Sequence, residues 1–267
     1  MEQATLMHDS WQQDKSAIAE AFGKAACTYD NHAAFQREVG ERLLAKLPQD
    51  LGGKTVLDLG CGTGYFSEKL RNRGAMVICC DLSPSMLDKA QQRCGFERMA
   101  YRQGDAEFLP FDDRSIDYVF SSLALQWCDD LSRPLREIRR VLKPHGKAYF
   151  STLLDGSLKE LKSAWGEVDA YQHVNDFISS NQVKIALAQS GNHRNHLDLP
   201  TMIVWYDTAF ALMRDLKGIG ANHVNGRSDG LTHRSALLKV ERAYRQFKNH
   251  QGLLPATYQV CLGVIHL

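Results

Sequence analysis

The stretch Val56-Leu57-Asp58-Leu59-Gly60-Cys61-Gly62-Thr63-Gly64 joins an apolar run to a glycine-rich segment. Residues 55–59 (TVLDL) predict a buried strand, and the sequence YFSEKLRNRG behind the glycines predicts a helix. Glycine permits positive φ and lets the backbone approach a ligand without an intervening Cβ atom. Tyr65 stands where a GxGxxG dinucleotide motif has its third glycine, and no Lys-Ser/Thr pair follows as in a P-loop. The segment therefore predicts a ligand-binding loop that belongs to neither of these classes.

The alternation of apolar runs and helical segments continues along the chain. Four further strands are predicted over residues 76–80, 99–103, 116–121 and 147–152. Ser83-Pro84 places an N-cap serine before a proline at the first helical position, which predicts a helix to about Cys94. Another helix is expected to open at Ser132 and to end near Lys143. Five strands alternating with helices indicate an α/β fold, a parallel doubly wound sheet with helices on both faces.

The flanking residues extend this organisation. Residues 14–47 predict a helical region that Pro48 ends. Residues 155–198 interrupt the alternation, and the elements expected from there on are helices around 157–170 and 175–189, a polar loop (SGNHRNH), a strand at 202–206, helices at 208–216 and 234–247, and a strand at 256–265. We therefore expect a mostly parallel sheet of seven strands. The chain is expected to divide into four parts: an N-terminal helical lid (1–48), a core (49–154), a helical insertion over the active site at the carboxyl ends of the strands (155–198), and the C-terminal part of the core sheet (199–267).

Composition excludes several classes of protein. The 267 residues carry 32 Lys+Arg against 31 Asp+Glu, and this net charge of +1 argues against a chain that coats nucleic acid or an anionic membrane. Hydrophobic residues make up 44% and charged residues 24%, which suits a globular protein with a sizeable core. No apolar run approaches the roughly 20 residues of a membrane helix. The polar, acidic start MEQATLMHDSWQQDK resembles neither a signal peptide nor a transit peptide.

The seven cysteines are odd in number and form no CxxC pair. Free, mostly buried thiols in a reducing compartment are expected, which favours the cytoplasm. No second Cys or His lies at ligand spacing, so a zinc site is not expected.

Three acids follow the glycine loop at the spacing of successive strands. Asp81 ends the second strand, 21 residues beyond Gly60, where a carboxylate can accept both ribose hydroxyls. Asp105 follows the third strand in the sequence GDAE, and Asp117 begins the fourth. This ordered set resembles the motifs of class I S-adenosylmethionine-dependent methyltransferases, which have a Rossmann-like fold. The resemblance implies S-adenosylmethionine as the cofactor, S-adenosylhomocysteine as the product and no metal.

The resemblance also implies a set of cofactor-binding residues. They surround the loop, the ends of the strands and the lid: Tyr29, Asp58, Gly60, Cys61, Gly62, Gly64, Asp81, Leu82, Met86, Asp105, Ala106, Glu107 and Ser121. Structural roles compete with some of these. Asp58 could cap the loop, Asp81 could cap a helix, and Asp117 is expected to order the core rather than touch ligand. Cys61 is expected to line the methionine end of the cofactor and not to act as a nucleophile.

The segment after the fourth strand bears on the substrate. Nucleic-acid amino-methyltransferases often carry an Asn/Asp-Pro-Pro-aromatic motif there, whereas this chain has Ser121-Ser122-Leu123-Ala124. Together with the neutral net charge, this disfavours nucleic acid as the substrate. A small or carrier-bound metabolite is favoured.

Four segments outside the cofactor motifs resemble the malonyl-acyl-carrier-protein O-methyltransferases of biotin synthesis. They are FGKAACTY (22–29), SLALQWC (122–128), GSL through Trp165 (156–165) and MRDLKGIGA (213–221), and the terminal stretch 258–265 fits as well. The resemblance runs from about residue 15 to the end, and it is weakest in the loop at 222–232. It implies esterification of the free carboxylate of a malonyl thioester, giving the methyl ester that enters pimeloyl and biotin synthesis.

The implied reaction sets the expected roles. A carboxylate is already anionic at neutral pH, so no acid–base residue is required. The protein would align the reacting atoms and exclude water. Arg214 and Lys217 are the candidates to bind the substrate carboxylate, although Arg214 also suits a structural or surface role. Tyr29, Gln126 and Trp127 are the candidate substrate-pocket residues.

The implied partner is an acidic acyl carrier protein, which would need a local basic face rather than a basic molecule. Candidate docking residues lie on two predicted helices: Arg133, Arg136, Arg139, Arg140 and Lys143 on one, and Lys159 and Lys162 on the other. Two other interpretations stay open at this stage. One is a related small-molecule methyltransferase acting on a free polycarboxylate or a quinone precursor, and the other is a non-catalytic cofactor-binding subunit.

Overall fold

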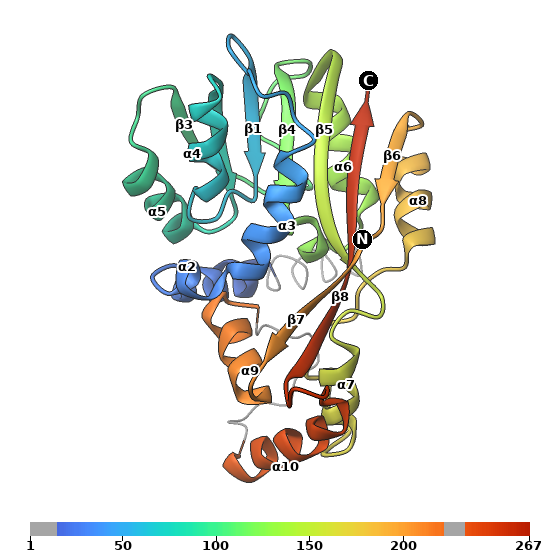
Figure 1. The fold of residues 1–267 in the computed structure, drawn as a ribbon. Coiled ribbons are helices and arrows are strands. Elements are labelled where there is room, and N and C mark those ends of the chain that lie inside the picture. The colour runs from blue at the N-terminus through green and yellow to red at the C-terminus, as the bar shows by residue number, and fades with distance from the viewer. Residues whose placement is uncertain (1–14, 222–232) are drawn as a thin grey trace, which may run out of the picture.

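The computed structural model describes residues 15–221 and 233–267 and shows an eight-stranded sheet covered by helices (Figure 1). The strand order is β3-β2-β1-β4-β5-β8-β6, and β7 also pairs with β8. The polar start of the chain and the loop at 222–232 lie outside the described residues. Within the described part of the chain, no helix combines the length and the apolar character needed to cross a membrane.

The first five strands form the parallel half of the sheet, as expected. Their bounds are β1 Thr55–Leu59, β2 Met76–Asp81, β3 Met99–Gln103, β4 Ile116–Ser122 and β5 Leu142–Leu154. Each of the pairs β1–β2, β2–β3, β1–β4 and β4–β5 is parallel. The chain therefore winds outward from β1 in both directions, and this places the end of β1 beside the ends of β2 and β4.

The last three strands form the antiparallel part of the sheet. Their bounds are β6 Asn195–Asp198, β7 Thr201–Tyr206 and β8 Leu254–His266. β8 runs antiparallel to β5, and both β6 and β7 pair antiparallel with β8. The expectation of seven strands was wrong by one, because residues 195–198 form β6 and not a loop. Three of the four side chains are polar and none is fully buried, so backbone pairing with β8 makes the strand.

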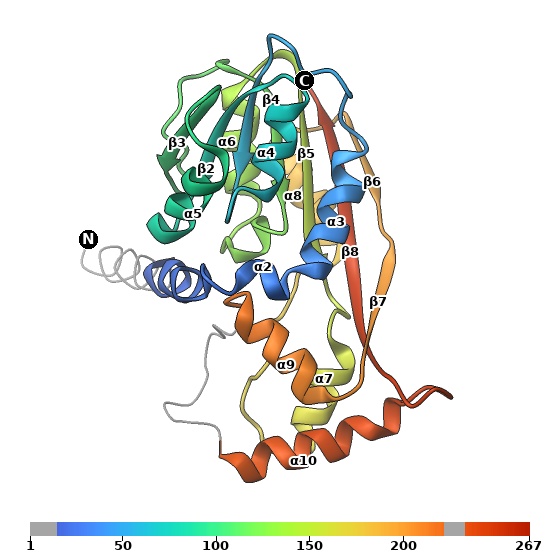
Figure 2. The ribbon, with the colours of Figure 1, turned by 60° about the vertical axis from the view of Figure 1, so that its left-hand side comes forward.

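Helices cover both faces of the sheet and bury two apolar clusters (Figures 1 and 2). α3 (Ala34–Leu44), α4 (Tyr65–Asn72) and α5 (Pro84–Cys94) contribute Val39, Leu70 and Ala90 to one cluster. α6 (Ser132–Val141) and α8 (Ser180–Gln189) contribute Ile138 and Leu187 to the other. α8, predicted as part of an insertion over the active site, instead packs beside α6.

The predicted N-terminal helical region divides into three helices. They are a helix over residues 15–25, α2 (Tyr29–His32) and α3. The Thr28 hydroxyl donates to the carbonyls of Ala25 and Gly218, both at 3.1 Å, and this side chain competes with continuation of the helix. The break turns α2 across the ends of the strands (Figure 2).

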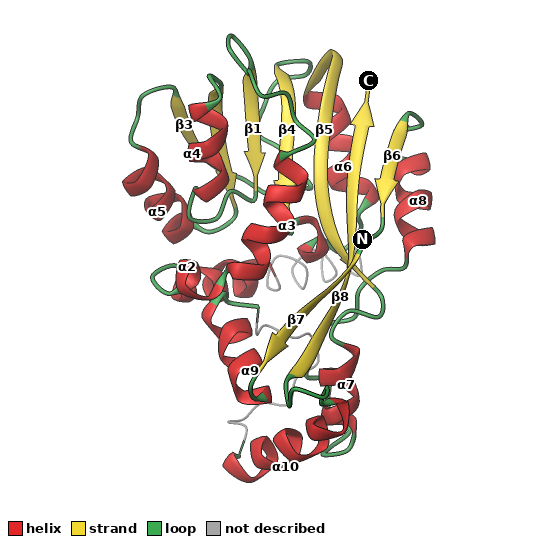
Figure 3. Cartoon of the chain, in the orientation of Figure 1, coloured by secondary structure: helices red, strands yellow, loops and turns green. Residues whose placement is uncertain are grey.

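A smaller group of elements extends beyond the carboxyl ends of the parallel strands (Figure 3). It contains α7 (Lys159–Gly166), α9 (Ala209–Gly218) and α10 (Arg234–Tyr244), with the lower parts of β7 and β8. α7 packs against α10 and β8, and α9 packs against α2. Short 3-10 helices occur at Leu125–Trp127 and Arg245–Phe247. All seven cysteines are free thiols, as expected.

Candidate active site

The glycine loop sits where β1 ends against β2. Gly60, Gly62 and Gly64 all have positive φ, of 72°, 53° and 80°. The N–H groups of Gly60 and Cys61 donate to the Cys80 carbonyl at 2.7 and 3.1 Å, which holds the loop against β2. A Cβ atom on Gly60 would lie 2.3 Å from the Cβ of Ala124, so this position cannot take a larger residue without displacement. The loop thus presents backbone, not side chains, to the space beyond it.

Asp81 lies at the end of β2 and faces the glycine loop. Its Oδ2 accepts the Gly62 N–H at 2.9 Å, and its Oδ1 accepts the Ser83 N–H at 2.8 Å. Burial raises the pKa of Asp81, while these backbone N–H groups oppose the increase. Each carboxylate oxygen still has capacity for another donor, so this side chain is oriented for a ligand that supplies hydroxyl groups.

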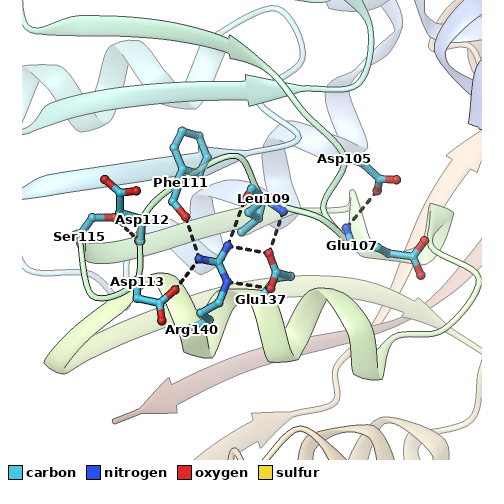
Figure 4. Close-up of polar contacts among 9 residues, drawn as sticks. All are labelled: Asp105, Glu107, Leu109, Phe111, Asp112, Asp113, Ser115, Glu137 and Arg140. Atoms are coloured by element: carbon cyan, nitrogen blue, oxygen red, sulfur yellow. Dashed lines mark hydrogen bonds and ion pairs between the residues drawn. The ribbon is translucent and has the colours of Figure 1, made fainter.

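The segment after β3 is held by a guanidinium group (Figure 4). Arg140 of α6 donates to the carbonyls of Leu109 and Phe111 at 2.9 and 2.7 Å and pairs with Glu137 and Asp113, both at 2.7 Å. Glu137 also accepts the Leu109 N–H at 2.8 Å. These contacts fix the chain downstream of Asp105, whose Oδ1 accepts the Glu107 N–H at 3.0 Å.

A first cavity lies between this segment, the glycine loop and the N-terminal helix. Nine of the residues predicted to bind cofactor or substrate line it: Tyr29, Gly60, Gly62, Asp81, Leu82, Met86, Asp105, Ala106 and Trp127. They come from α2, from the ends of β1, β2 and β3, from the start of α5 and, for Trp127, from the 3-10 helix after β4, so residues far apart in sequence meet in one place.

Five residues predicted to bind cofactor do not line this cavity: Asp58, Cys61, Gly64, Glu107 and Ser121. Asp58 is buried, accepts the Ser67 hydroxyl at 2.5 Å, and burial raises its pKa to about 7. Gly64 packs against Ala90 of α5. The Ser121 hydroxyl donates to the Leu59 carbonyl at 2.9 Å. These contacts give three of the five a role in supporting the loop from behind.

Sequence reasoning missed a set of contributors from the helix over residues 15–25. Lys15, Ile18 and Phe22 line the first cavity, and the Lys15 ammonium pairs with Asp105 and with Glu107. Their spacing of three and four residues puts them on one face of a helix, and this pattern was the available signal.

A second cavity adjoins the first. Phe22, Tyr29, Leu123 and Trp127 line both, and the rings of Phe22 and Trp127 meet edge to face with centroids 5.2 Å apart. Burial raises the pKa of the Tyr29 phenol, and the nearby Asp81 carboxylate raises it further. Tyr29 therefore stands between the ligand-facing acid of the first cavity and the second cavity.

The wall of the second cavity is mainly apolar, with a few polar side chains. Gln36, Gln126, His173 and Asn175 are the amide and imidazole groups among its described lining residues. Gln126 Nε2 donates to the Leu123 carbonyl at 2.7 Å, whereas the Oε1 atoms of Gln126 and Gln36 are buried without a partner. Buried polar atoms without partners are unusual and mark a place where a bound ligand can complete the hydrogen bonding.

Arg214 and Lys217, predicted to bind the substrate carboxylate, line neither cavity. Both are exposed on α9, while Leu216 between them faces the second cavity. Their proposed role therefore stays a prediction that the placement does not favour. Among residues 15–221 and 233–267, no group of three or more His, Cys, Asp or Glu is arranged to hold a metal ion.

Comparison with protein families gives a match to the methyltransferase domain over residues 57–150. The chain is 44% identical over 254 residues to a malonyl-[acyl-carrier protein] O-methyltransferase of Serratia marcescens, covering 95% of this chain and 96% of that protein. A protein of the same name from Yersinia pestis is also 44% identical, with 95% and 92% covered. The biotin biosynthesis bifunctional protein BioHC of Cellvibrio japonicus is 43% identical, and the match spans 49% of its length.

Comparison with solved structures shows that the fold of this chain is similar to that of known methyltransferases. A putative methyltransferase of Haloferax volcanii, solved with the Trm112 methyltransferase activator, superposes with a TM-score of 0.59 at 22% identity, covering 93% of this chain and 96% of that one. The YcgJ protein of Bacillus subtilis also has a TM-score of 0.59, at 18% identity and with 86% and 97% covered.

Proposed function

Because the chain belongs to the malonyl-[acyl-carrier protein] O-methyltransferase family, we propose that it transfers a methyl group from S-adenosylmethionine to the free carboxylate of a malonyl thioester. The observation that carries this conclusion is 44% identity along nearly the whole of both chains. The product is the malonyl thioester with its free carboxylate converted to a methyl ester, and it is used in biotin synthesis. The chain is an S-adenosylmethionine-dependent O-methyltransferase.

The first cavity has groups that fit S-adenosylmethionine, which when bound supplies an electrophilic methyl group. Asp81 has open acceptor positions for the two ribose hydroxyls, and the backbone N–H groups of Gly62 and Ser83 hold its carboxylate in place. Asp105 and Ala106 line the cavity where an adenine amino group needs an acceptor. Gly60 and Gly62 leave room beside the backbone for the methionine end.

The second cavity is the proposed place of the malonyl group. It shares Tyr29, Phe22 and Trp127 with the first cavity, so an acceptor there would meet the cofactor across these rings. The carboxylate needs no base to become nucleophilic. The contribution of the chain is to orient the acceptor and to keep water from two opposite charges that cancel during the reaction. The aromatic side chains of the shared wall provide this exclusion.

Acyl carrier protein is the proposed partner. Electrostatic steering of an acidic carrier needs exposed basic groups near the mouth of the acceptor cavity. Leu158, directly before α7, lines the second cavity, and Lys159 on α7 is exposed. Arg140 of α6 and Lys143 near the start of β5 are already engaged by acids of the same molecule, as is Lys162 of α7 by Asp176. Because the exposed Lys159 directly follows Leu158 of the second cavity, the α7 face is favoured over α6 as the docking site.

Mass spectrometry of malonyl-carrier protein incubated with the enzyme and S-adenosylmethionine tests the function. We expect a gain of one methyl group that alkaline ester hydrolysis removes. Free malonate, malonyl-coenzyme A and a quinone precursor are the comparison acceptors. Transfer to one of these but not to the carrier-bound malonyl group would contradict the proposed substrate. A cofactor complex that methylates none of them would indicate a non-catalytic binding subunit.

A further inference from the structure

His173 provides the second cavity with a group that can carry positive charge. It lies in the connection between α7 and α8, and its side chain is 9% exposed. Among the described residues that line this cavity, none is a lysine or an arginine. A buried carboxylate is stable only when it is paired or hydrogen-bonded. In the cavity proposed to receive a malonyl carboxylate, this imidazole is thus the nitrogen base available to pair with it.

The imidazole ring is fixed on two sides. Nε2 lies 2.8 Å from Asp169 Oδ1, which also accepts the Tyr171 N–H at 3.0 Å. Although partial burial raises the pKa of Asp169, the Tyr171 N–H and the His173 ring hold it below its usual range, so this acid is anionic. On its face, the ring stacks on Trp165 with centroids 3.6 Å apart and an interplanar angle of 11°. The Asp169 carboxylate and the Trp165 indole thus hold the imidazole in one orientation.

We propose that His173 binds the carboxylate of the acyl group through Nδ1 and so selects malonyl over uncharged acyl thioesters. With Nε2 donating to Asp169, Nδ1 is the remaining polar atom of the ring, and the imidazolium donates from both nitrogens. The inference rests on the proposed function, since it assigns the carboxylate to the second cavity. It places carboxylate recognition on the α7–α8 connection and not on Arg214 and Lys217 of α9.

The rest of the wall suits a single carboxylate at this position. Asp169 is the acid that pairs with the ring, and the titratable side chains that line the same cavity with His173 are the phenols of Tyr29 and Tyr258. The described lining residues from α3 and α9 are uncharged. A charged hydrogen bond to the reacting carboxylate stabilises the bound substrate more than the transition state, because the carboxylate loses its negative charge during methyl transfer. Loss of His173 should therefore raise KM more than it lowers kcat.

The test measures binding of malonyl- and acetyl-carrier protein to enzyme loaded with S-adenosylhomocysteine, together with kcat and KM for methyl transfer. Wild type should prefer the malonyl form. His173→Gln should lose most of this preference and raise KM by about ten- to one-hundredfold, the range for a hydrogen bond to a charged group. Acetyl binding should not change. Asp169→Asn leaves the imidazole in place and should reduce the same preference to a smaller extent.

Three control variants make the outcome decisive. His193→Gln exchanges an exposed histidine and should keep the malonyl preference. If Arg214→Gln or Lys217→Gln removes the preference while His173→Gln keeps it, with an unchanged melting temperature, the inference is overturned. A wild type that does not distinguish malonyl from acetyl also overturns it. A preference that depends on His173 without any methyl transfer would refute the proposed function and leave this inference standing.

Discussion

Two carboxylates near the glycine loop, the buried Asp58 and the half-buried Asp81, differ in what their oxygens contact. Asp81 accepts two backbone N–H groups and lines the first cavity. Asp58 accepts the Ser67 hydroxyl and does not line the first cavity. The first is arranged for a ligand and the second for the support of the loop, so the two acids should respond differently to the same amide substitution.

Asp81→Asn should weaken S-adenosylmethionine binding by about ten- to one-hundredfold, since an amide cannot accept from two hydroxyls as the carboxylate does. Isothermal titration calorimetry measures the change. Asp117→Asn is the matched control: Asp117 accepts the Thr55 N–H at 3.0 Å and pairs with Lys143 at 2.7 Å, at the start of β4. An equal loss of affinity in both variants would contradict a ribose-binding role for Asp81.

Asp58→Asn should change how stability depends on pH. Burial raises the pKa of Asp58 to about 7, whereas an unfolded aspartate titrates near ~3.9. Between these values the folded state binds a proton that the unfolded state does not, so the free energy of unfolding falls as pH rises, by at most about 1.4 kcal/mol per pH unit. The variant should lack this decline. Urea midpoints of both proteins across this range measure it, and parallel curves would refute the prediction.

At the residue scale, sequence motifs identified the side chains at strand ends and missed those whose position depends on tertiary packing. Asp81 and Asp105 follow strands whose ends must meet in a doubly wound sheet, so their meeting is predictable. His173 lies in an irregular connection, where no periodicity indicates which wall it will join. Gln126 was expected in the substrate pocket and lines the second cavity, but only the fold shows that Gln36 joins it there.

Among the elements, α6 holds the segment after β3 through Arg140. Arg140→Lys keeps one positive charge but loses the planar fork that reaches two carbonyls and two carboxylates. We expect a loss of about 2 kcal/mol in the free energy of unfolding and a severalfold weaker affinity for S-adenosylmethionine. Denaturant unfolding and calorimetry measure the two effects.

Arg136→Lys is the control for that prediction, because it makes the same exchange at an exposed position of the same helix. It should leave stability and affinity unchanged. If Arg140→Lys behaves like Arg136→Lys, the segment after β3 does not depend on this guanidinium.

The elements that sequence predicted best are those with strong local patterns. β1 and β3 have the expected bounds, and for β1 a short apolar run before the glycine loop suffices to indicate them. β6 was missed because its sequence, NHLD, has one apolar residue and depends on β8 for its pairing. The break between residue 25 and α2 was missed because the Thr28 hydroxyl bonds across the fold to Gly218.

In the whole molecule, 32 basic residues nearly balance 31 acidic ones. The net charge therefore cannot attract an acidic carrier protein, and electrostatic steering depends on local basic patches. Changing Lys159 and Lys162 to glutamate should lower kcat/KM for malonyl-carrier protein by about tenfold at low salt. Turnover of malonyl-coenzyme A, if accepted, should change little. Reversal of Arg136 and Arg139, exposed on α6, is the comparison. A larger loss from the α6 pair than from the α7 pair would place the carrier on the other helix.

The position of β8 has a consequence for how the molecule is made. β8 follows every other strand in the sequence, yet it pairs with β5, β6 and β7 and brings Tyr258 to the second cavity. Because the chain is synthesised from its N-terminus, the outer edge of β5 has no pairing partner until residues 254–266 leave the ribosome. An unpaired strand edge in a nascent chain is prone to aggregate. Shielding by a chaperone should therefore matter most in the last stage of translation, when β1 to β5 have been made and β8 has not.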